Sequence, residues 1–131
     1  MINEIITLKD GRIATCSNDC TIKVFDPKTT LILILLFLVP PENPDGHRYR
    51  IISIAGLDNG NLVSIDYDDK LKIWSITNNC YKCLHTINKV SEYQLVGLSD
   101  NRVASKNFNN EVIIRVLNEP YNDNPKKLVL V

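Results

Sequence analysis

The chain has 131 residues, of which 44% are hydrophobic and 23% are charged, which is ordinary for one globular domain and excludes a disordered chain. Its 15 basic and 15 acidic residues balance to zero net charge without a long run of either sign, so we expect no nucleic-acid partner. The first ten residues lack the basic start and apolar stretch of a secretory signal, so we expect an intracellular protein.

A hairpin signal occurs three times along the chain. A turn dipeptide leads into a short apolar strand within residues 10–15, 59–64 and 100–105. Asp-Gly and Asn-Gly favour tight hairpins because we expect both turn residues to adopt positive φ. Each copy continues into another strand, and the closing positions Phe25, Trp74 and Leu117 follow one another after 49 and 43 residues. This spacing is typical of a four-stranded repeat of about 40–45 residues that carries a small extra loop.

Twelve strands follow in chain order, four in each repeat, and no stretch sustains the apolar period of a helix. The expected strands are residues 2–8, 12–17, 21–26 and 31–39; then 50–57, 61–67, 70–75 and 81–87; then 93–98, 102–108, 113–118 and 127–131. Alignment of Leu117 with Trp74 places two extra residues near Asn110 and Glu111, so the sequence predicts a longer turn there. The prolines of residues 40–45 predict an exposed loop.

Residues 31–39 are nine consecutive apolar residues. They are about half the ~20 residues that a membrane-spanning helix needs, so we expect no membrane span. The fourth strand of such a repeat would alternate apolar and polar residues if it lay at an outer edge, and this segment does not alternate. Either a partner shelters it or it is a decayed, aggregation-prone edge.

The four cysteines raise the question of a metal or redox site. Cys80 and Cys83 form a C-x-x-C pair, whereas Cys16 and Cys20 have three residues between them and belong to another repeat. Four zinc-binding thiolates need tight spacing and turns that let them converge. We therefore expect small buried or half-buried cysteines and no metal or cofactor, with a zinc or redox site as the alternative.

The repeats resemble the WD-repeat β-propeller family. The second repeat carries the match best, with Gly46-His47, then Ser64 to Asp68, then Lys72-Ile73-Trp74 in the order of the family's G-H, S-x-x-x-D and W-D elements, although Ser75 replaces the final Asp. The other two copies keep parts of the pattern: Thr15, Asp19 and Phe25-Asp26 in the first, and Ser105, Asn109 and Leu117-Asn118 in the third.

The resemblance implies an all-β fold of three four-stranded antiparallel blades that form an open, partial propeller. The single domain, 1–131, would comprise blade one at about 1–39, blade two at about 46–87 and blade three at about 91–131. It also implies a buried structural tetrad of His47, Ser64, Asp68 and Trp74, in which hydrogen bonds satisfy the polar groups inside the blade. The other two blades, with only fragments of this set, should be less rigid.

The same residues include a Ser, a His and an Asp, the components of a catalytic triad. Ser64 lies in the middle of a strand without the G-x-S-x-G context of an exposed nucleophile, so we expect no enzymatic activity. His85, on an outer strand without a paired ligand, is interpreted as a surface or edge residue.

Closed propellers have roughly four to eight blades, so three blades leave two apolar faces without neighbours. A protein partner, self-association or the rest of a longer chain would cover them. The resemblance implies a non-catalytic protein-interaction scaffold; the alternative is a truncated or split fragment without independent activity. The upper-rim positions implied as partner-binding are Asn18, Tyr67 and Phe108, followed by Arg48 and Tyr49. For the rim aromatics the other interpretation is that each ring packs on its own turn.

Overall fold

The computed structural model describes residues 1–28, 32–36, 44–77 and 80–129, and within these ranges the regular elements are all β-strands. They form three antiparallel sheets of four strands, which we call blades one, two and three. Blade one consists of β1 (Ile2–Thr7), β2 (Ile13–Ser17), β3 (Ile22–Phe25) and β4 (Ile32–Leu36). Blade two consists of β5 (Ile51–Gly56), β6 (Leu62–Asp66), β7 (Leu71–Thr77) and β8 (Cys80–Ile87). Blade three consists of β9 (Glu92–Leu98), β10 (Arg102–Asn107), β11 (Glu111–Val116) and β12 (Lys126–Val129).

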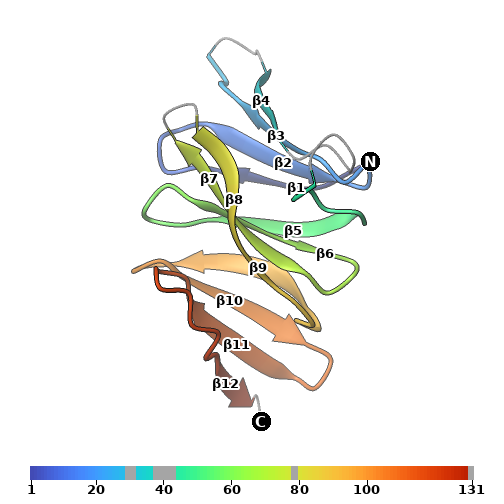
Figure 1. The fold of residues 1–131 in the computed structure, drawn as a ribbon, viewed down its shortest axis with the longest axis vertical. Coiled ribbons are helices and arrows are strands. Elements are labelled where there is room, and N and C mark those ends of the chain that lie inside the picture. Colours follow the sequence, from blue (N-terminus) through green and yellow to red (C-terminus); the bar gives the residue numbers. More distant parts are fainter. Residues whose placement is uncertain (29–31, 37–43, 78–79, 130–131) are drawn as a thin grey trace.

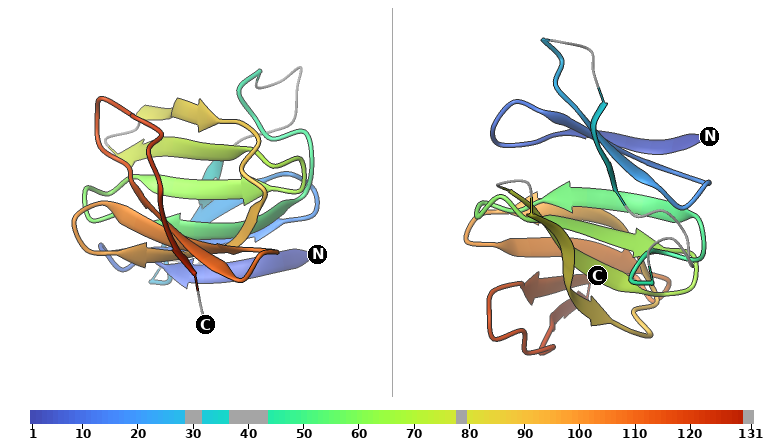
Figure 2. Two further views of the ribbon diagram at one scale, coloured as in Figure 1. Left: turned by 90° about the horizontal axis from the view of Figure 1, so that it is seen from below. Right: turned by 45° about the horizontal axis from the view of Figure 1, so that its top comes forward.

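The blades follow one another in chain order along the long axis of the molecule, with blade two between its neighbours (Figures 1 and 2). Each sheet is a simple meander, so its first strand and its fourth strand lie at opposite edges. The first strands β1, β5 and β9 contact one another from blade to blade. They form the inner line of the stack, and the fourth strands lie at its outer edge. No described helix is long and apolar enough to cross a membrane.

The expected twelve strands are present, and the predicted fourth strand at residues 31–39 coincides in part with β4. Residues 31 and 37–39 of that prediction, most of the loop at 40–45 and the last two residues of the chain lie outside the described ranges. Whether the apolar run is sheltered or decayed therefore stays a prediction, as do the blade boundaries.

The first hairpin turn of each blade is a three-residue loop and not the two-residue turn that the dipeptides suggested. Leu8 and Leu57 each donate a backbone N–H to the residue four positions on and accept one from Gly11 or Gly60. In these two loops only the glycine has positive φ, near 90°. Glycine tolerates that conformation without steric cost. In blade three both Asp100 and Asn101 have positive φ.

The second turn has the same length in all three blades, so the prediction of two extra residues near Asn110 and Glu111 is wrong. The positive-φ residue of this turn is Cys20, Asp69 or Asn110. The strand registers agree, because Leu62 pairs with Trp74 and Val103 pairs with Arg115. Arg115, and not Leu117, therefore occupies the place of Trp74. The sequence alignment had matched one large apolar residue with another. In the structure, equivalent strand positions of blades two and three are always 41 residues apart.

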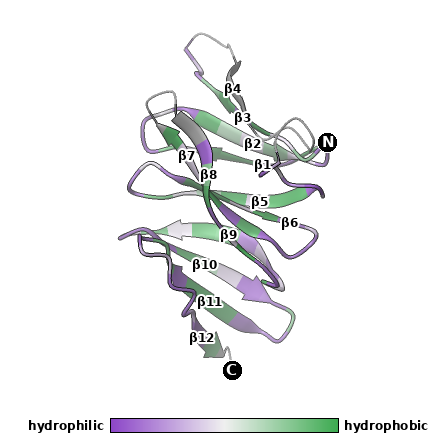
Figure 3. Cartoon of the chain, in the orientation of Figure 1, coloured by the Kyte–Doolittle hydropathy of each residue, from purple (hydrophilic) through white to green (hydrophobic). Residues whose placement is uncertain are grey.

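Two apolar clusters hold the blades together, one at each seam. The blade one to blade two seam buries the side chains of Ala14, Cys16, Ile22, Val24, Ile51, Ile54, Leu62, Trp74 and Ile76. The blade two to blade three seam buries those of Ala55, Leu57, Val63, Ile65, Leu71, Ile73, Ile87, Val90, Leu95, Val103 and Leu117. Hydrophobic residues accordingly lie on the strands of all three blades, and the turns are largely polar (Figure 3). Blade two is the only described blade with both faces covered.

Candidate functional site

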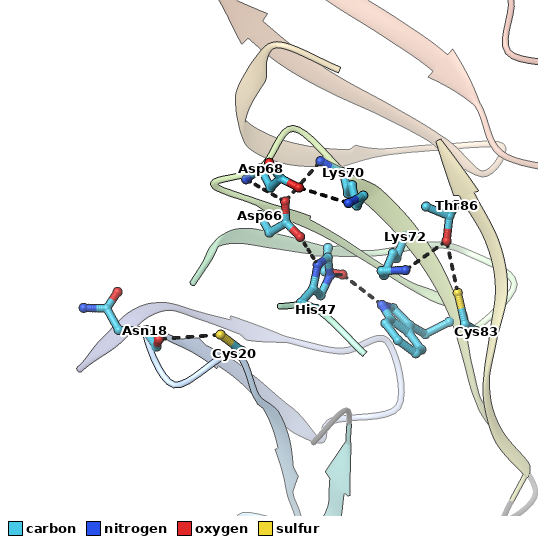
Figure 4. Close-up of polar contacts among 11 residues, drawn as sticks. Asn18, Cys20, His47, Asp66, Asp68, Lys70, Lys72, Cys83 and Thr86 are labelled. Atoms are coloured by element: carbon cyan, nitrogen blue, oxygen red, sulfur yellow. Dashed lines mark hydrogen bonds and ion pairs between the residues drawn. The ribbon is translucent and has the colours of Figure 1, made fainter. Parts of the chain in front are cut away.

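A buried polar network joins the segment before β5 to the second and third strands of blade two (Figure 4). His47 lies at its centre, with Nδ1 2.6 Å from Asp66 Oδ2 and Nε2 2.5 Å from Ser64 Oγ. Trp74 Nε1 donates to the same Ser64 Oγ over 2.8 Å. His47, Ser64 and Trp74 are fully buried, and Asp66 is 1% exposed. The residues therefore form one hydrogen-bonded chain in the interior of the blade.

The direction of each hydrogen bond in the network follows from the number of protons available. The indole of Trp74 can only donate, so Ser64 Oγ accepts there and uses its own proton for His47 Nε2. The remaining ring proton of a neutral histidine is then on Nδ1, which donates to the Asp66 carboxylate. Each proton is used once, and the network needs a neutral imidazole beside an ionised carboxylate.

The pKa directions agree with this protonation. Burial lowers the pKa of His47 below its ordinary value, outweighing the hydrogen bond and the negative charge of Asp66. Burial by itself raises the pKa of Asp66, but the hydrogen bond from His47 and two backbone N–H groups outweigh it, so the pKa is lowered. His47 is thus neutral and Asp66 ionised near pH 7.

The acidic member of the network is Asp66 and not the predicted Asp68. Side chains two apart on a strand lie on the same face, so Asp66 shares the face of Ser64 at the last position of β6. Asp68 lies beyond the strand in the turn, where its side chain is 44% exposed and pairs with Lys70. Asp66 Oδ1 also accepts the backbone N–H groups of Asp68 and Lys70, at 2.8 and 3.1 Å, and thereby closes the turn.

Blade three has a charged network at the corresponding place, which the sequence analysis missed. Ser105 donates to Glu92 Oε1 over 2.5 Å, and Arg115, at the register position of Trp74, pairs with the same carboxylate. Arg115 Nε donates to Asp123 Oδ1 over 3.0 Å. Asn107 closes the turn by accepting two backbone N–H groups, as Asp66 does. The offset of 41 residues between blades two and three would have placed Ser105 and Arg115 at the positions of Ser64 and Trp74, but no such signal marks Glu92.

The Ser64–His47–Asp66 arrangement has the connectivity of a catalytic triad but cannot act as one. A nucleophilic serine must reach a substrate carbonyl, whereas Ser64 and His47 are both 0% exposed. The Ser64 hydroxyl is also occupied on its acceptor side by the indole of Trp74. The network therefore stabilises the blade and fixes the segment that precedes β5.

The described cysteines do not converge. Cys16 lies in the first seam, where burial and the nearby Glu4 raise the pKa of its thiol to about 12. Cys20 lies in the second turn of blade one, and Cys83 on β8 contacts Thr86. In the part of the chain that the structure describes, no group of three or more His, Cys, Asp or Glu residues is placed to hold a metal ion. The side chain of Cys80 lies outside that part.

The three first-choice rim residues line one cleft of about 690 Å³, which we call the rim cleft. Asn18, Tyr67 and Phe108 come from the second turn of each blade and lie at the same end of the stack. Tyr67 and Phe108 are 63% and 83% exposed. The remaining lining residues, from the starts of the inner strands and the adjoining turns, are Met1, Asn3, Arg50, Ile52, Asp66, Asp69, Ser91, Glu92 and Tyr93. Sequence reasoning named none of these as rim residues.

Each rim aromatic has one local contact and keeps most of its surface free. The Arg50 guanidinium lies 4.1 Å from the centroid of the Tyr67 ring, and the rings of Tyr93 and Phe108 are 4.8 Å apart. Asn18 accepts a hydrogen bond from Asn3 over 2.8 Å. Both rings thus contact a residue at the start of an inner strand, Arg50 before β5 or Tyr93 in β9, and both remain largely exposed. Their role in partner binding stays a prediction.

The second-choice rim residues and His85 lie elsewhere. Arg48 and Tyr49 are exposed on the segment before β5, and neither lines the rim cleft. His85 is half-buried on the outer strand β8, where its ring stacks on Tyr121 with centroids 5.0 Å apart.

Comparison with known proteins matches the chain in part by sequence and almost wholly by fold. No protein-family model matches the sequence. The nuclear distribution protein PAC1 of Candida dubliniensis is 35% identical over 66 residues, which are 49% of this chain and 12% of that protein, and PAC1 of Candida albicans matches equally. The chain thus spans about an eighth of the length of these relatives.

Solved structures share the fold over nearly the whole chain. The WD40 repeats of RRP9 align with a TM-score of 0.79 and 19% identity, over 98% of this chain and 38% of that one. U3-55K aligns with a TM-score of 0.80 and 19% identity, over 98% and 39%. A chain of the mitotic checkpoint complex aligns with a TM-score of 0.73 and 16% identity, over 95% and 38%. At these identities the likeness establishes the fold, and function has to be argued from the site.

Proposed function

Because this chain has the fold of three blades of a WD-repeat β-propeller, we propose that it is a non-catalytic protein-interaction scaffold that binds a peptide segment of its partner in the rim cleft. The observation that carries the proposal is the convergence of Asn18, Tyr67 and Phe108, one from each blade, on a single cleft. The repeat places equivalent turn residues side by side, and two of them are exposed aromatic residues.

The size and chemistry of the rim cleft fit a short peptide. Its volume of about 690 Å³ is within the range of roughly 300–1,000 Å³ that is usual for ligand sites. Exposed aromatic residues that neighbouring groups hold in place lose little conformational freedom on binding, which is why they are frequent hot spots. Arg50 and Asp69 add charges of opposite sign to a wall that also includes the buried, paired carboxylates of Asp66 and Glu92, so the cleft can orient a charged peptide side chain.

Other properties agree with a protein partner inside the cell. The chain has no net positive charge of the kind that favours binding to a phosphate backbone. The described cysteines Cys16, Cys20 and Cys83 are free thiols, which is usual for a reducing compartment.

Selection from a random peptide library displayed on phage tests the proposal. We expect selected peptides to bind the Tyr67→Ala and Phe108→Ala variants at least tenfold more weakly than the unmodified chain. Tyr49→Ala, which removes a 49%-exposed aromatic side chain outside the rim cleft, is the matched control and should leave the affinity unchanged. Equal losses in all three variants, or peptides indifferent to Tyr67 and Phe108, would refute the assignment.

The second candidate is a fragment of a longer WD-repeat protein without independent activity. It is favoured because the alignment with the chains that share the fold covers 98% of this chain but only 38–39% of those chains. The neighbouring coding sequence tests it: further repeats in the same reading frame support a fragment, and an interruption by stop codons contradicts it.

A further inference from the structure

Both seams between blades use the same polar contact on the inner strands. Glu4 Oε1 of blade one accepts the backbone N–H of Ile54 in blade two over 2.8 Å, and it also accepts the Ser53 hydroxyl. Ser53 Oγ in turn accepts the backbone N–H of Leu95 in blade three over 2.8 Å. In each seam, therefore, a side chain at an inner-strand irregularity bonds the N–H of the next inner strand.

Gln94 occupies the next position in this series. It immediately precedes Leu95, as Ser53 precedes Ile54 and Glu4 precedes Ile5. The register shift of β9 lies between Tyr93 and Val96, slightly further along the strand than the shifts of β1 and β5, and Gln94 has a φ of 62° there, which Glu4 and Ser53 do not share. Its exposed side chain carries an amide oxygen that can accept a hydrogen bond as the Glu4 carboxylate does. Blade three thus presents an acceptor for a further inner strand.

The open faces of blades one and three have the residue types of a buried seam. Ile5 is 64% exposed, whereas the equivalent Ile54 and Leu95 are 1% and 4% exposed. Val96 on the open face of blade three is 53% exposed, whereas the equivalent Ala55 is 3% exposed. The difference is the absence of an adjoining blade within the described residues, and such an apolar surface is typical of an interface.

The match extends along both faces. Blade one carries apolar residues at four of the five positions that blade two buries in the first seam, namely Ile2, Ile5, Ile13 and Phe25 in place of Ile51, Ile54, Leu62 and Trp74. Blade three carries Val96, Leu98, Val112 and Ile114 in place of Ala55, Leu57, Leu71 and Ile73. One departure is Lys106, in place of the buried Ile65, and its ammonium lies 5.1 Å from the centroid of the Tyr93 ring at the rim cleft.

We propose that two copies of this chain join head to tail, the open face of blade three of each copy packing on the open face of blade one of the other, with Gln94 Oε1 accepting the Ile5 N–H across each new seam. The inference rests on the propeller scaffold proposed above and is independent of the rim cleft. Both complementary faces are present on one chain, so a second copy covers both of them at once. The result is a closed ring of six blades, within the usual range of four to eight.

Mixing two face-blocked variants tests the proposal. Ile5→Lys blocks the face of blade one and Val96→Lys blocks the face of blade three, and both positions are more than half exposed, so each variant should remain folded by circular dichroism. Light scattering should give twice the 14.9 kDa chain mass for the unmodified chain and the monomer mass for each variant alone. A one-to-one mixture should recover a dimer, because one intact seam remains between the two variants.

Two further variants define the interface. Tyr49→Lys, exposed and outside both faces, should leave the dimer unchanged. Gln94→Ala should weaken it by about two- to tenfold for each of the two seams, the usual effect of one hydrogen bond. A monomeric unmodified chain, a dimer that persists in Ile5→Lys, a mixture that stays monomeric or a ladder of larger species would overturn the proposal. If the unmodified chain forms the dimer but binds no peptide, the proposed function of the rim cleft is refuted and the dimer proposal still holds.

Discussion

Replacement of Ser64 by alanine should destabilise blade two more than the equivalent change destabilises blade three. The substitution removes the hydrogen bonds to Trp74 and His47, at about 1 kcal/mol each. It also leaves His47 Nε2 buried without its donor, which costs about 1–3 kcal/mol more. We therefore expect Ser64→Ala to lower the free energy of unfolding by about 3–5 kcal/mol, a large part of the roughly 5–15 kcal/mol of a typical domain.

Ser105→Ala is the matched control, because Ser105 has the equivalent position in blade three. Glu92 keeps its pairing with Arg115 when that hydroxyl is removed, so the loss should be about 1 kcal/mol. Urea unfolding of both variants, followed by Trp74 fluorescence and by circular dichroism, measures the difference. An equal loss in the two variants, or a loss below 1 kcal/mol for Ser64→Ala, would refute the network as the main polar support of blade two.

Three other changes have defined outcomes. Asp66→Ala should lower the urea midpoint strongly, because it removes the partner of His47 and opens the turn, whereas Asp68→Ala should leave it nearly unchanged; equal effects would contradict the assignment of Asp66. Stability should fall as pH drops below about 6.5, since the pKa of His47 is lowered on folding and the unfolded chain then binds more protons, and the lowered pKa of Asp66 should extend the loss below pH 3.8. A melting temperature that is constant from pH 7.5 to 5 would contradict the buried neutral imidazole. Gly97→Ala should destabilise the second seam, because the added Cβ would lie 2.6 Å from the carbonyl oxygen of Gly56. An unchanged urea midpoint would contradict this close contact between β5 and β9.

The strand order of the fold could be predicted because hairpin signals and apolar alternation are local. Turn residues such as Gly11 and Gly60 mark the same loop in two blades, and the apolar strands beside them pair with their neighbours in sequence. Antiparallel meanders need no information about distant contacts. One local error, the number of turn residues with positive φ, came from reading the dipeptide without the length of its loop. A second, the two extra residues near Asn110 and Glu111, came from aligning Leu117 with Trp74 by residue type.

The polar network could be predicted only in part, since it depends on where a strand ends. Asp66 and Asp68 both lie on the Ser64 side of an extended strand by alternation, and only the end of β6 at Asp66 distinguishes them. Glu92 and Arg115 escaped notice because charged residues at buried positions look like surface residues in a sequence. Their burial, 8% and 7% exposed, follows from the pairing between them, which a single sequence does not reveal.

Amide hydrogen exchange across the three inner strands tests most directly whether the open faces are covered in solution. Ile5, Ile54 and Leu95 hold equivalent positions in β1, β5 and β9, and the last two donate their N–H groups across the described seams. A ring closed by a second copy predicts that the Ile5 amide is protected to the same degree as those of Ile54 and Leu95, and that protection of Ile5 is lost in Val96→Lys. Rapid exchange at Ile5 in the unmodified chain, with Ile54 protected, would contradict it.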